Sequence, residues 1–587
     1  MLANKRKTVP LISEISEETF ESQVPDLLLL FSRDHIHALT LSNIIQSFCQ
    51  KSCSNNLQIG LGLYLYNNVR SKKVIDLLHN MGVSCSYNDI RSLITSLAKN
   101  AVKTENHIYV PYGIQSVDQE KKNYIHSSID NFDLNEETLS GKDTTHSMAL
   151  VVFQEKLEDL DVDGKIPKES KYSLSMEDVD IPFQKIERYY NPNKRPEPDR
   201  LDNLQCSTTE HEYSRKVNFV WRFLRHLDKE KPFLGWTEYH DVLSTSSVKV
   251  AQIAYLPFLN NPPTDCDTIY TSMLRLVELA EHLNQHHIII TADLAIYSKA
   301  QEILWNKPAR LDGKVTLQLG GMHLCLAFLA SIGFLYKDSG LYDMLVETEI
   351  YAPNTCKQIL EGKHYSRSIR SLILTSDALT RLLIDSFYEW MEKEPLDEEV
   401  LSHDILQDLK DGKFRKSALD TYLNALNPLF EKMKEFENIG SKSSPTFSYW
   451  LSFLDSVNLL LDYQSAERNG SFQLHLKCVF EMLPYLKAGG RHLYAKWVPI
   501  YLKDMNQLKL TQPEMYDYLE RGNFVVKKTN EKTFNCVASD MALEQSINRD
   551  CKSSSGVVGF TRKPTALLRW MMTRHIVGSY SQNFEGV

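Results

Sequence analysis

Three acidic residues lie where a fold could bring their carboxylates together. Asp130 follows "NYIHSSI" and Asp293 follows the apolar run "HHIIITA", each of which we predict to be a strand that ends before the acid. Glu544 lies within "SDMALEQSINRD", which we predict to be helical. They are far apart along the chain, so only the fold could make them meet. Converging carboxylates bind Mg²⁺ or Mn²⁺, which activate water or a hydroxyl and stabilise the transition state of phosphoryl transfer. The residue types therefore point to a metal site at Asp130, Asp293 and Glu544.

Each of these positions also has a simpler interpretation. An Asp between a strand and a helix most often caps the helix or forms a turn, so both the cap and the metal ligand remain open for Asp293. Asp133 competes with Asp130 as the first of the three acids along the chain, since both belong to one acidic cluster. His323 follows a pair of glycines and could be a metal ligand, a phosphate contact or a core histidine with satisfied hydrogen bonds, of which the last is the commonest.

The elements that must position these residues follow the pattern of an α/β fold. Residues 111–340 contain a predicted hairpin, whose second strand is "SMALVVFQ", and an amphipathic helix over "DCDTIYTSMLRLVELAEHLNQ". A buried strand before Asp293, a helix over "SKAQEILWNK" and a strand over "GKVTLQLGGMH" complete this part. Strand, helix and strand with short connections are typical of a sheet flanked by helices. The acidic stretch 155–212, rich in Pro and Asn, indicates a flexible insertion.

Helical segments flank this core on both sides. Residues 26–110 are a predicted helical module behind a disordered N-terminus at 1–25; DNA binding is open, but a packing module is commoner because the presumed second helix lacks a basic face. Residues 341–515 carry wide apolar stripes and predict a large all-helical insertion. Residues 516–587 return to the core with a strand over "GNFVVKK", the helix of Glu544 and a closing helix. The predicted class is α/β, with a mixed sheet flanked by helices.

The bulk composition bounds the class of protein. The 587 residues carry a formal net charge of -9, which argues against a uniformly basic nucleic-acid binder. Basic residues nevertheless gather near the C-terminus, where Lys552, Arg562 and Lys563 are candidate nucleic-acid contacts. No apolar run approaches the roughly 20 residues that span a bilayer, and the first residues lack a secretory signal. Because the ten cysteines are scattered, we expect a soluble protein of a reduced intracellular compartment.

Several blocks of the chain resemble an uncharacterised, transposase-like family found in invertebrate mobile elements. They are "DNFDLNEETLSGKDTTHSMALVVF", "TADLAIYSKAQEILW", "LQLGGMHLCLAFLASIG", "SGLYDMLVETEIYAPNTCKQILEGKHYSRSIRS" and "ASDMALEQSINRDCKSSSGVVGF". The resemblance extends over most of the chain. The family is similar to the hAT and Kyakuja–Dileera–Zisupton transposases, in which a ribonuclease H-like core is interrupted by a helical insertion.

The resemblance implies metal-dependent cleavage or transfer of DNA strands at a D-D-E site, with Mg²⁺ or Mn²⁺ as cofactor. The first Asp would be Asp130 on the first strand, the second Asp293 on the fourth, and the acid after the insertion Glu544. The auxiliary residues of this hypothesis are Asp133, His146, His323 and Arg549. DNA is the expected partner and the nucleus the expected location, with neither a membrane nor a small-molecule cofactor involved; self-association stays open.

The chain departs from the family pattern beside the acids. Leu294 stands where the pattern "ADQ" has an amide, and Met541 replaces the amide of "DQxxEQ". The pattern "TFHGMG" appears as "TTHSMA". The rival hypothesis is therefore a catalytically inactive, transposon-derived scaffold that binds DNA or protein. A wholly helical structural protein is a third interpretation, which the β-rich stretches around Asp130 and Asp293 oppose.

Overall fold

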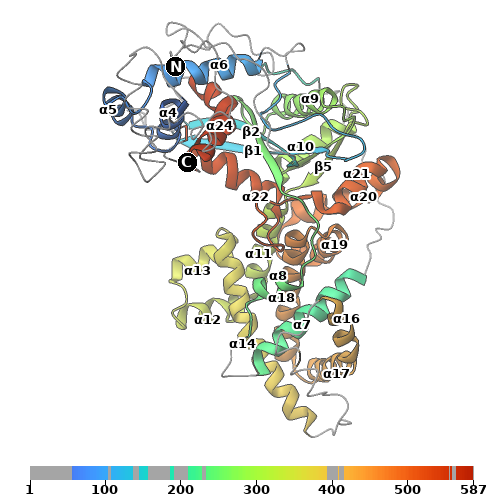
Figure 1. Cartoon of the computed structure of the whole chain (residues 1–587). Coiled ribbons are helices and arrows are strands. Elements are labelled where there is room, and N and C mark those ends of the chain that lie inside the picture. Colours follow the sequence, from blue (N-terminus) through green and yellow to red (C-terminus); the bar gives the residue numbers. More distant parts are fainter. Residues whose placement is uncertain are drawn as a thin grey trace.

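The computed structural model describes the larger part of the chain, with the sheet in one half and a group of long helices extending away from it (Figure 1). The described residues are 56–102, 108–135, 144–156, 185–190, 209–227, 233–392, 408, 416–553, 556–557 and 564–585. The first described helices are α4 (Asn56–Asn68), α5 (Lys72–Asn80) and α6 (Tyr87–Val102).

A five-stranded mixed sheet forms the centre of the first half. Its strands are β1 (Ile125–Asn135), β2 (Thr144–Glu155), β3 (Ala251–Leu259), β4 (Ile288–Ala292) and β5 (Val315–Leu319), in the order β3-β2-β1-β4-β5. β1 is parallel to β4 and β4 to β5, whereas β2 is antiparallel to both β1 and β3. Only β2 therefore runs against the other four strands. The prediction of a mixed α/β fold is confirmed.

Helices cover both faces of this sheet. Successive side chains of a strand point to opposite faces, and Ile129 and Phe132 of β1 accordingly belong to different buried clusters. Helices α9 (Cys266–His282) and α10 (Leu294–Trp305) pack on β4, and α9 also contacts β1. The other face meets the C-terminal helices described below. Because both faces are covered, β4 is buried along its whole length, which explains its unbroken apolar sequence.

Asp130 lies within β1, so the prediction that the strand ends there is wrong. The residues after it look like a turn, because Asn131 and Asp133 are polar and exposed. Phe132 between them is fully buried and stacks on Phe258 at 4.5 Å between ring centroids. This alternation of exposed and buried side chains continues the strand to Asn135.

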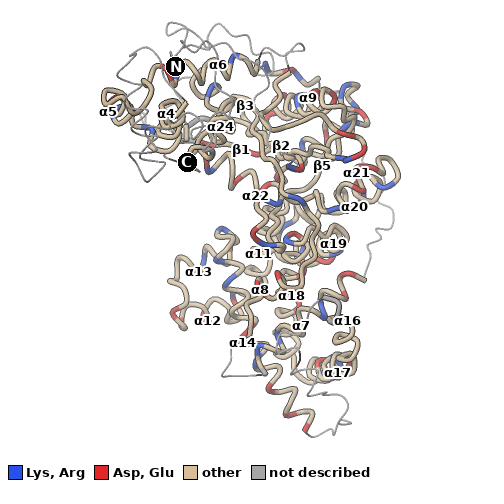
Figure 2. The backbone as a smooth tube through the Cα atoms, in the orientation of Figure 1, with Lys and Arg blue, Asp and Glu red and all other residues tan. Residues whose placement is uncertain are grey.

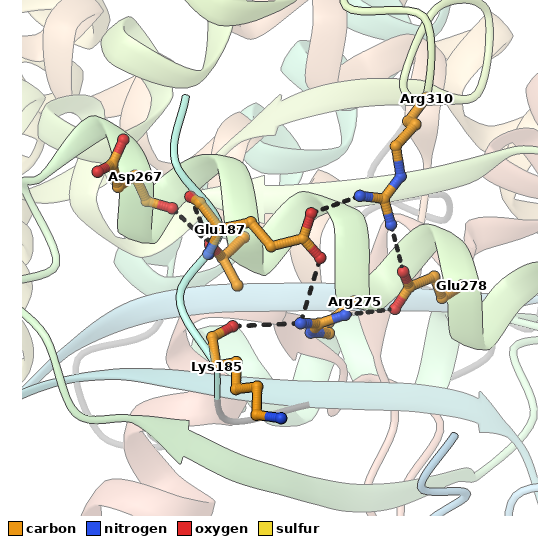
Figure 3. A network of polar contacts seen from close by, with 7 residues as sticks. Lys185, Glu187, Asp267, Arg275, Glu278 and Arg310 are labelled. Carbon is orange, nitrogen blue, oxygen red and sulfur yellow. Dashed lines mark hydrogen bonds and ion pairs between the residues drawn. The ribbon is translucent and has the colours of Figure 1, made fainter. Parts of the chain in front are cut away.

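Residues 185–190, in the middle of the predicted flexible insertion, are tied to α9 (Figure 3). The backbone N–H of Glu187 donates to Thr271 Oγ1 at 2.9 Å, and that of Tyr189 donates to Asp267 Oδ1 at 2.7 Å. The Glu187 carboxylate also pairs with Arg275 and Arg310. For these residues the prediction of a loose connection is wrong, since their polar groups are satisfied by α9 and Arg310.

The long helices lie between the fifth strand and the return to the sheet. They are α11 (Gly321–Tyr336), the 3₁₀ turn η2 (Lys337–Ser339), α12 (Leu341–Glu347), α13 (Pro353–Leu360), α14 (Tyr365–Met391), α16 (Lys416–Ala425), α17 (Asn427–Ser443), α18 (Pro445–Asn469), α19 (Phe472–Ala488), α20 (His492–Thr511) and α21 (Pro513–Tyr518).

Helices α7 (Thr209–Leu227) and α8 (Trp236–Leu243) pack with these long helices, although the predicted boundaries place them in the sheet-containing part at 111–340. Trp221 of α7 shares a buried cluster with Leu429 of α17 and Phe387 of α14. An amphipathic pattern specifies that a helix buries one face, but it does not specify the partner of that face. The helical part is therefore built from two separate stretches of the chain.

The last part of the chain returns to the sheet. Its elements are the π-helical turn η4 (Leu519–Asn523), the short antiparallel strands β6 (Val525–Val526) and β7 (Val537–Ala538), α22 (Ser539–Leu543), the π-helical turn η5 (Glu544–Asn548), α23 (Arg549–Lys552) and α24 (Pro564–Glu585). Helix α24 packs on β3 and on helices α4 and α6. It thereby joins the described N-terminal helices to the sheet.

Among the described residues, no single helix is long and apolar enough to cross a membrane. One pair of helical segments, Gly321–Ser339 and Leu341–Glu347, reaches that length and composition when taken together, but the two are bent by 82° relative to each other.

A pair of glycine substitutions tests the packing of α11 against α13. A Cβ on Gly333 would lie 2.0 Å from the carbonyl oxygen of Leu360, whereas a Cβ on Gly578, in the middle of α24, would meet nothing within 4 Å. We expect Gly333→Ala to destabilise the fold by about 3 kcal/mol through overpacking against backbone. Gly578→Ala should stabilise it by about 0.5–1 kcal/mol, because alanine favours a helix over glycine. Equilibrium urea unfolding compares the two, and equal midpoints would contradict this packing.

Candidate functional site

The strand register brings Asp130 and Asp293 side by side. Ile129 pairs with Ala292 in the parallel ladder of β1 and β4, and Ala292 pairs with Leu319 in that of β4 and β5. The next residue of each strand is Asp130, Asp293 or Gly320. These three therefore form one row at the edge of the sheet where the parallel strands β4 and β5 end, which is where open α/β sheets commonly bind ligands.

Asp130 carries the most perturbed carboxyl group of this row. Its side chain is 5% exposed; Oδ1 accepts a hydrogen bond from the Asn131 N–H at 2.7 Å, and the buried Oδ2 has no partner among the described residues. Burial raises the pKa of Asp130 to about 7; the charge of His323 opposes this rise, and the carboxylates of Asp293 and Glu544 add to it. Both other members of the predicted trio thus lie within electrostatic reach of Asp130.

Asp293 is a helix cap. It is half-buried, and its Oδ1 accepts the N–H of Ile296 at 2.9 Å in the first turn of α10. This bond satisfies one of the free amides at the start of the helix. Because the cap uses one carboxylate oxygen, it fixes the side chain at the strand end without excluding a second role for the other oxygen.

Asp540 is a fourth acid of this site, which the sequence pattern alone did not indicate. It is 1% exposed at the start of α22 and faces the first turn of α11, where its oxygens accept the N–H groups of Met322 at 3.0 Å and His323 at 3.1 Å. The His323 ring pairs with the same carboxylate at 2.9 Å from Nδ1. Burial opposes its ionisation, but the bond to His323 and the two amides hold the pKa of Asp540 below its usual value.

The glycine pair before His323 leaves room for this contact. A Cβ on Gly320 would lie 2.4 Å from Asp540 Oδ2 and 3.3 Å from the carbonyl oxygen of Ala292. A Cβ on Gly321 would lie 3.0 Å from Glu467 Oε2. Any side chain at Gly320 would therefore displace the carboxylate of Asp540. Of the roles left open for His323, the structure shows a histidine whose ring pairs with the buried acid Asp540 beside the site.

Glu544 follows Asp540 by one helical turn. Residues four apart lie on the same face of a helix, so the position of Asp540 directs Glu544 toward the same edge of the sheet. Leu543 and Ile547 of this segment pack with Phe132 of β1 in one buried cluster. Glu544 is half-buried and begins a π-helical turn, an irregularity that often marks functional positions in helices.

Tyr494 of α20 forms part of the surroundings of this site. Burial raises the pKa of its hydroxyl, and the neighbouring carboxylates of Asp293 and Asp540 raise it further, while Arg491 opposes them. Tyr494 therefore remains a neutral hydroxyl near the acids. Its position comes from the helical part, so that part lies against the site.

The structure places the predicted auxiliary acid and histidine elsewhere. Asp133 and His146 face each other across the hairpin and pair at 2.6 Å, with side chains 45% and 57% exposed. Asp133 follows Asp130 by three residues, so it points to the other face of the strand. Asp130 is therefore the better candidate for the first position, and His146 does not join the trio.

The predicted basic residues lie beyond Glu544 or outside the described part of the chain. Arg549 is exposed and lies near Lys528, whose pKa it helps to lower. Lys552 is exposed, with Nζ 5.9 Å from the ring centroid of Phe132. Arg562 and Lys563 fall outside the described residues.

The donor set fits a hard divalent cation by chemistry. Carboxylate oxygens are the ligands that Mg²⁺ and Mn²⁺ prefer, and Asp130 Oδ2 is buried without a partner among the described residues. Among the described residues, no three Asp, Glu, His or Cys side chains are arranged closely enough to hold one ion as they stand. Ligation by Asp130, Asp293 and Glu544 would therefore require their side chains to turn toward one point.

The pair of His323 and Asp540 makes the stability of the chain depend on pH. Burial disfavours the charged imidazole, but Asp540, Asp130 and Asp293 outweigh it and raise the pKa of His323 from 6.5 to about 9. The stability that the charged His323 adds to the fold is fully present below pH 6.5 and is lost as the pH rises through 9.

We expect the unfolding free energy to fall by up to about 3 kcal/mol more in the wild type than in His323→Gln over this range. Urea unfolding below and above the window measures this, with His146→Gln as the matched control at an exposed, paired histidine. The same pH dependence in all three proteins would contradict a charged His323.

A family model described as "Domain of unknown function (DUF8702)" matches residues 235–587. This segment includes Asp293, His323, Asp540 and Glu544, and it begins after Asp130. Comparison with curated proteins found no match, and comparison with solved structures found none either. Since the matched segment is more than half of the chain, the protein belongs to the DUF8702 family.

Proposed function

We propose that the chain is a ribonuclease H-like nuclease or DNA strand transferase that uses a divalent cation at Asp130, Asp293 and Glu544. The observation that carries the proposal is the row of Asp130 and Asp293 on adjacent parallel strands, with Glu544 on a helix that packs over the same edge. The charges of Asp293 and Glu544 both act on Asp130, although the three acids come from distant parts of the chain.

The topology supports the fold part of this proposal. A hairpin and a third strand, followed by a helix, a strand, a helix and a strand, give the sheet order β3-β2-β1-β4-β5 with only β2 reversed. This is the plan that the resemblance to transposases implies for a ribonuclease H-like core. The long helices inserted between β5 and the helix of Glu544 agree with the same plan.

The side chains around the trio would position a cation and its substrate. When bound, the cation would activate water or a hydroxyl and stabilise the charge of a phosphoryl transition state. Burial strips water from Asp130, the cap bond orients Asp293, and Asp540 anchors the helix that carries Glu544. The imidazolium of His323 would reduce repulsion among the carboxylates before the cation binds.

DNA as the substrate rests on the family resemblance, because the charge of the chain gives it little support. The net charge is -9, and acidic and basic residues are interspersed along the elements in Figure 2. Phosphate contacts would then come from local groups such as Arg549 and Lys552, which follow Glu544 on the same helical segment and are exposed. Substitution of residues that contact phosphates weakens DNA binding to a similar degree for every DNA sequence.

The second candidate function is a catalytically inactive scaffold that binds DNA or protein. One observation favours it: Leu294 and Met541 stand beside Asp293 and Asp540 where the transposase-like pattern has amides. In this case the buried acids would serve only to tie α10 and α22 to the sheet.

Cleavage of supercoiled plasmid DNA with Mg²⁺ or Mn²⁺ separates the two functions. We expect metal-dependent nicking that falls at least about 100-fold in Asp130→Asn and in Asp293→Asn, since each substitution removes a ligand charge from the transition state. Asparagine caps a helix as well as aspartate does, so Asp293→Asn keeps the start of α10.

Asp133→Asn is the matched control, because it removes an exposed carboxylate from the same strand as Asp130. Nicking that survives unchanged in both site variants would refute the assignment. DNA binding without nicking by the wild type would favour the scaffold.

A further inference from the structure

A separate cavity of about 540 Å³ lies between helices α7, α14, α17 and α18 of the helical part. Helices α7, α14 and α17 lie away from the sheet in Figure 1, and none of the residues that line the cavity belongs to the carboxylate site. Its volume falls in the range of small-molecule sites. The wall combines polar and charged side chains with an apolar, partly aromatic part, which includes Phe219 and Phe223 from α7, Leu383 and Ile384 from α14, and Phe430 and Met433 from α17.

Arg222 of α7 places a buried positive charge in this wall. The residue is 5% exposed; one guanidinium nitrogen, Nη1, donates to Thr380 Oγ1 at 3.1 Å, and the buried Nε has no partner among the described residues. Among the described residues, no carboxylate lies within ion-pair distance of Arg222. Burial lowers the pKa of Arg222 to about 10, which still leaves the group charged at neutral pH. Among the neighbouring charges, the carboxylate of Asp377 opposes this fall in pKa most, although it forms no ion pair with Arg222. A buried cation without an anion in direct contact is costly.

Acidic side chains line the same cavity from the other helices. Glu437 of α17 is half-buried, and burial together with the nearby Asp455 raises its pKa to about 7. Asp455 of α18 lies 3.7 Å from Arg215 and also influences Arg222 without touching it. Arg222 and Glu437 thus face one cavity without an ion pair between them, which leaves room for a molecule that joins them.

The other cations around the cavity have partners. Lys216 donates to Asn427 Oδ1 at 2.6 Å, Lys434 pairs with Glu431 at 3.1 Å, and Arg215 pairs with Asp462 at 2.6 Å. Arg222 is therefore the cation in this wall that a ligand anion would reach with least competition.

We propose that this cavity binds a small zwitterion with an apolar body, such as a hydrophobic amino acid, with its carboxylate at Arg222 and its ammonium group at Glu437 and Asp455. A guanidinium binds a carboxylate through charge-assisted hydrogen bonds, and the aromatic wall takes up the apolar body. This inference does not depend on the proposed nuclease function.

Calorimetric titration of the full chain with three probes of the same body tests the inference. L-phenylalanine carries both charges, 3-phenylpropionate only the negative one and 2-phenylethylamine only the positive one. We expect L-phenylalanine to bind at least tenfold more tightly than either single-charge probe. Arg222→Gln should weaken its binding at least tenfold. Arg225→Gln, which removes a charge from the same helix outside the cavity, should leave binding unchanged.

Thermal unfolding of each variant shows whether it is folded. If Arg222→Gln does not fold, Leu383→Trp replaces it as the test: Leu383 is half-buried and lines the cavity, so the indole should block the probe and abolish binding with Arg222 intact. No binding of any probe would mean that the cavity holds water only and would overturn the inference. Equal affinities for the three probes, or unchanged affinity in Leu383→Trp, would overturn it as well.

Discussion

The contact of the Asp540 carboxylate with the start of α11 is the constraint on which the rest of the site depends. One buried acid satisfies two backbone N–H groups and the ring of His323, so it joins the last part of the chain to the end of the fifth strand. Hydrogen bonds to a buried charge are strong, and their loss leaves that charge without solvation. Gly320 permits this approach, because a Cβ there would lie 2.4 Å from the carboxylate.

The position of Glu544 follows from this anchor. Asp540 fixes the first turn of its helix, and Leu543 and Ile547 fix the next by packing with Phe132. Glu544 is therefore half-buried beside the sheet, and its charge contributes to the raised pKa of Asp130. The same arrangement holds the long helices close, since α11 leads directly from this contact into the helical part.

Much of the sheet could be predicted from the sequence, and the site only in part. The isoleucines before Asp293 predict a strand because burial on both faces selects an unbroken apolar run. The cap role of Asp293 also follows from its position between a predicted strand and a predicted helix. These features are set by residues near one another in the chain.

Other features depend on distant partners and could not be predicted from local pattern. Asp540 looks like an ordinary acid in the first turn of a helix, and its partners are 217 and 218 residues away. The buried residues of β1 before Asp130 include His126, Ser127 and Ser128, so the strand lacks the apolar alternation that marks its length. Helix α7 shows an apolar face but not the helices that cover it.

The central claim is that Asp130, Asp293 and Glu544 together hold a divalent cation, and anomalous diffraction from crystals soaked in Mn²⁺ tests it most directly. The account predicts an anomalous peak at the end of β4, with oxygens of the three carboxylates about 2 Å from the ion. A clear peak elsewhere on the chain, or no peak between these carboxylates while they keep their positions, would contradict it.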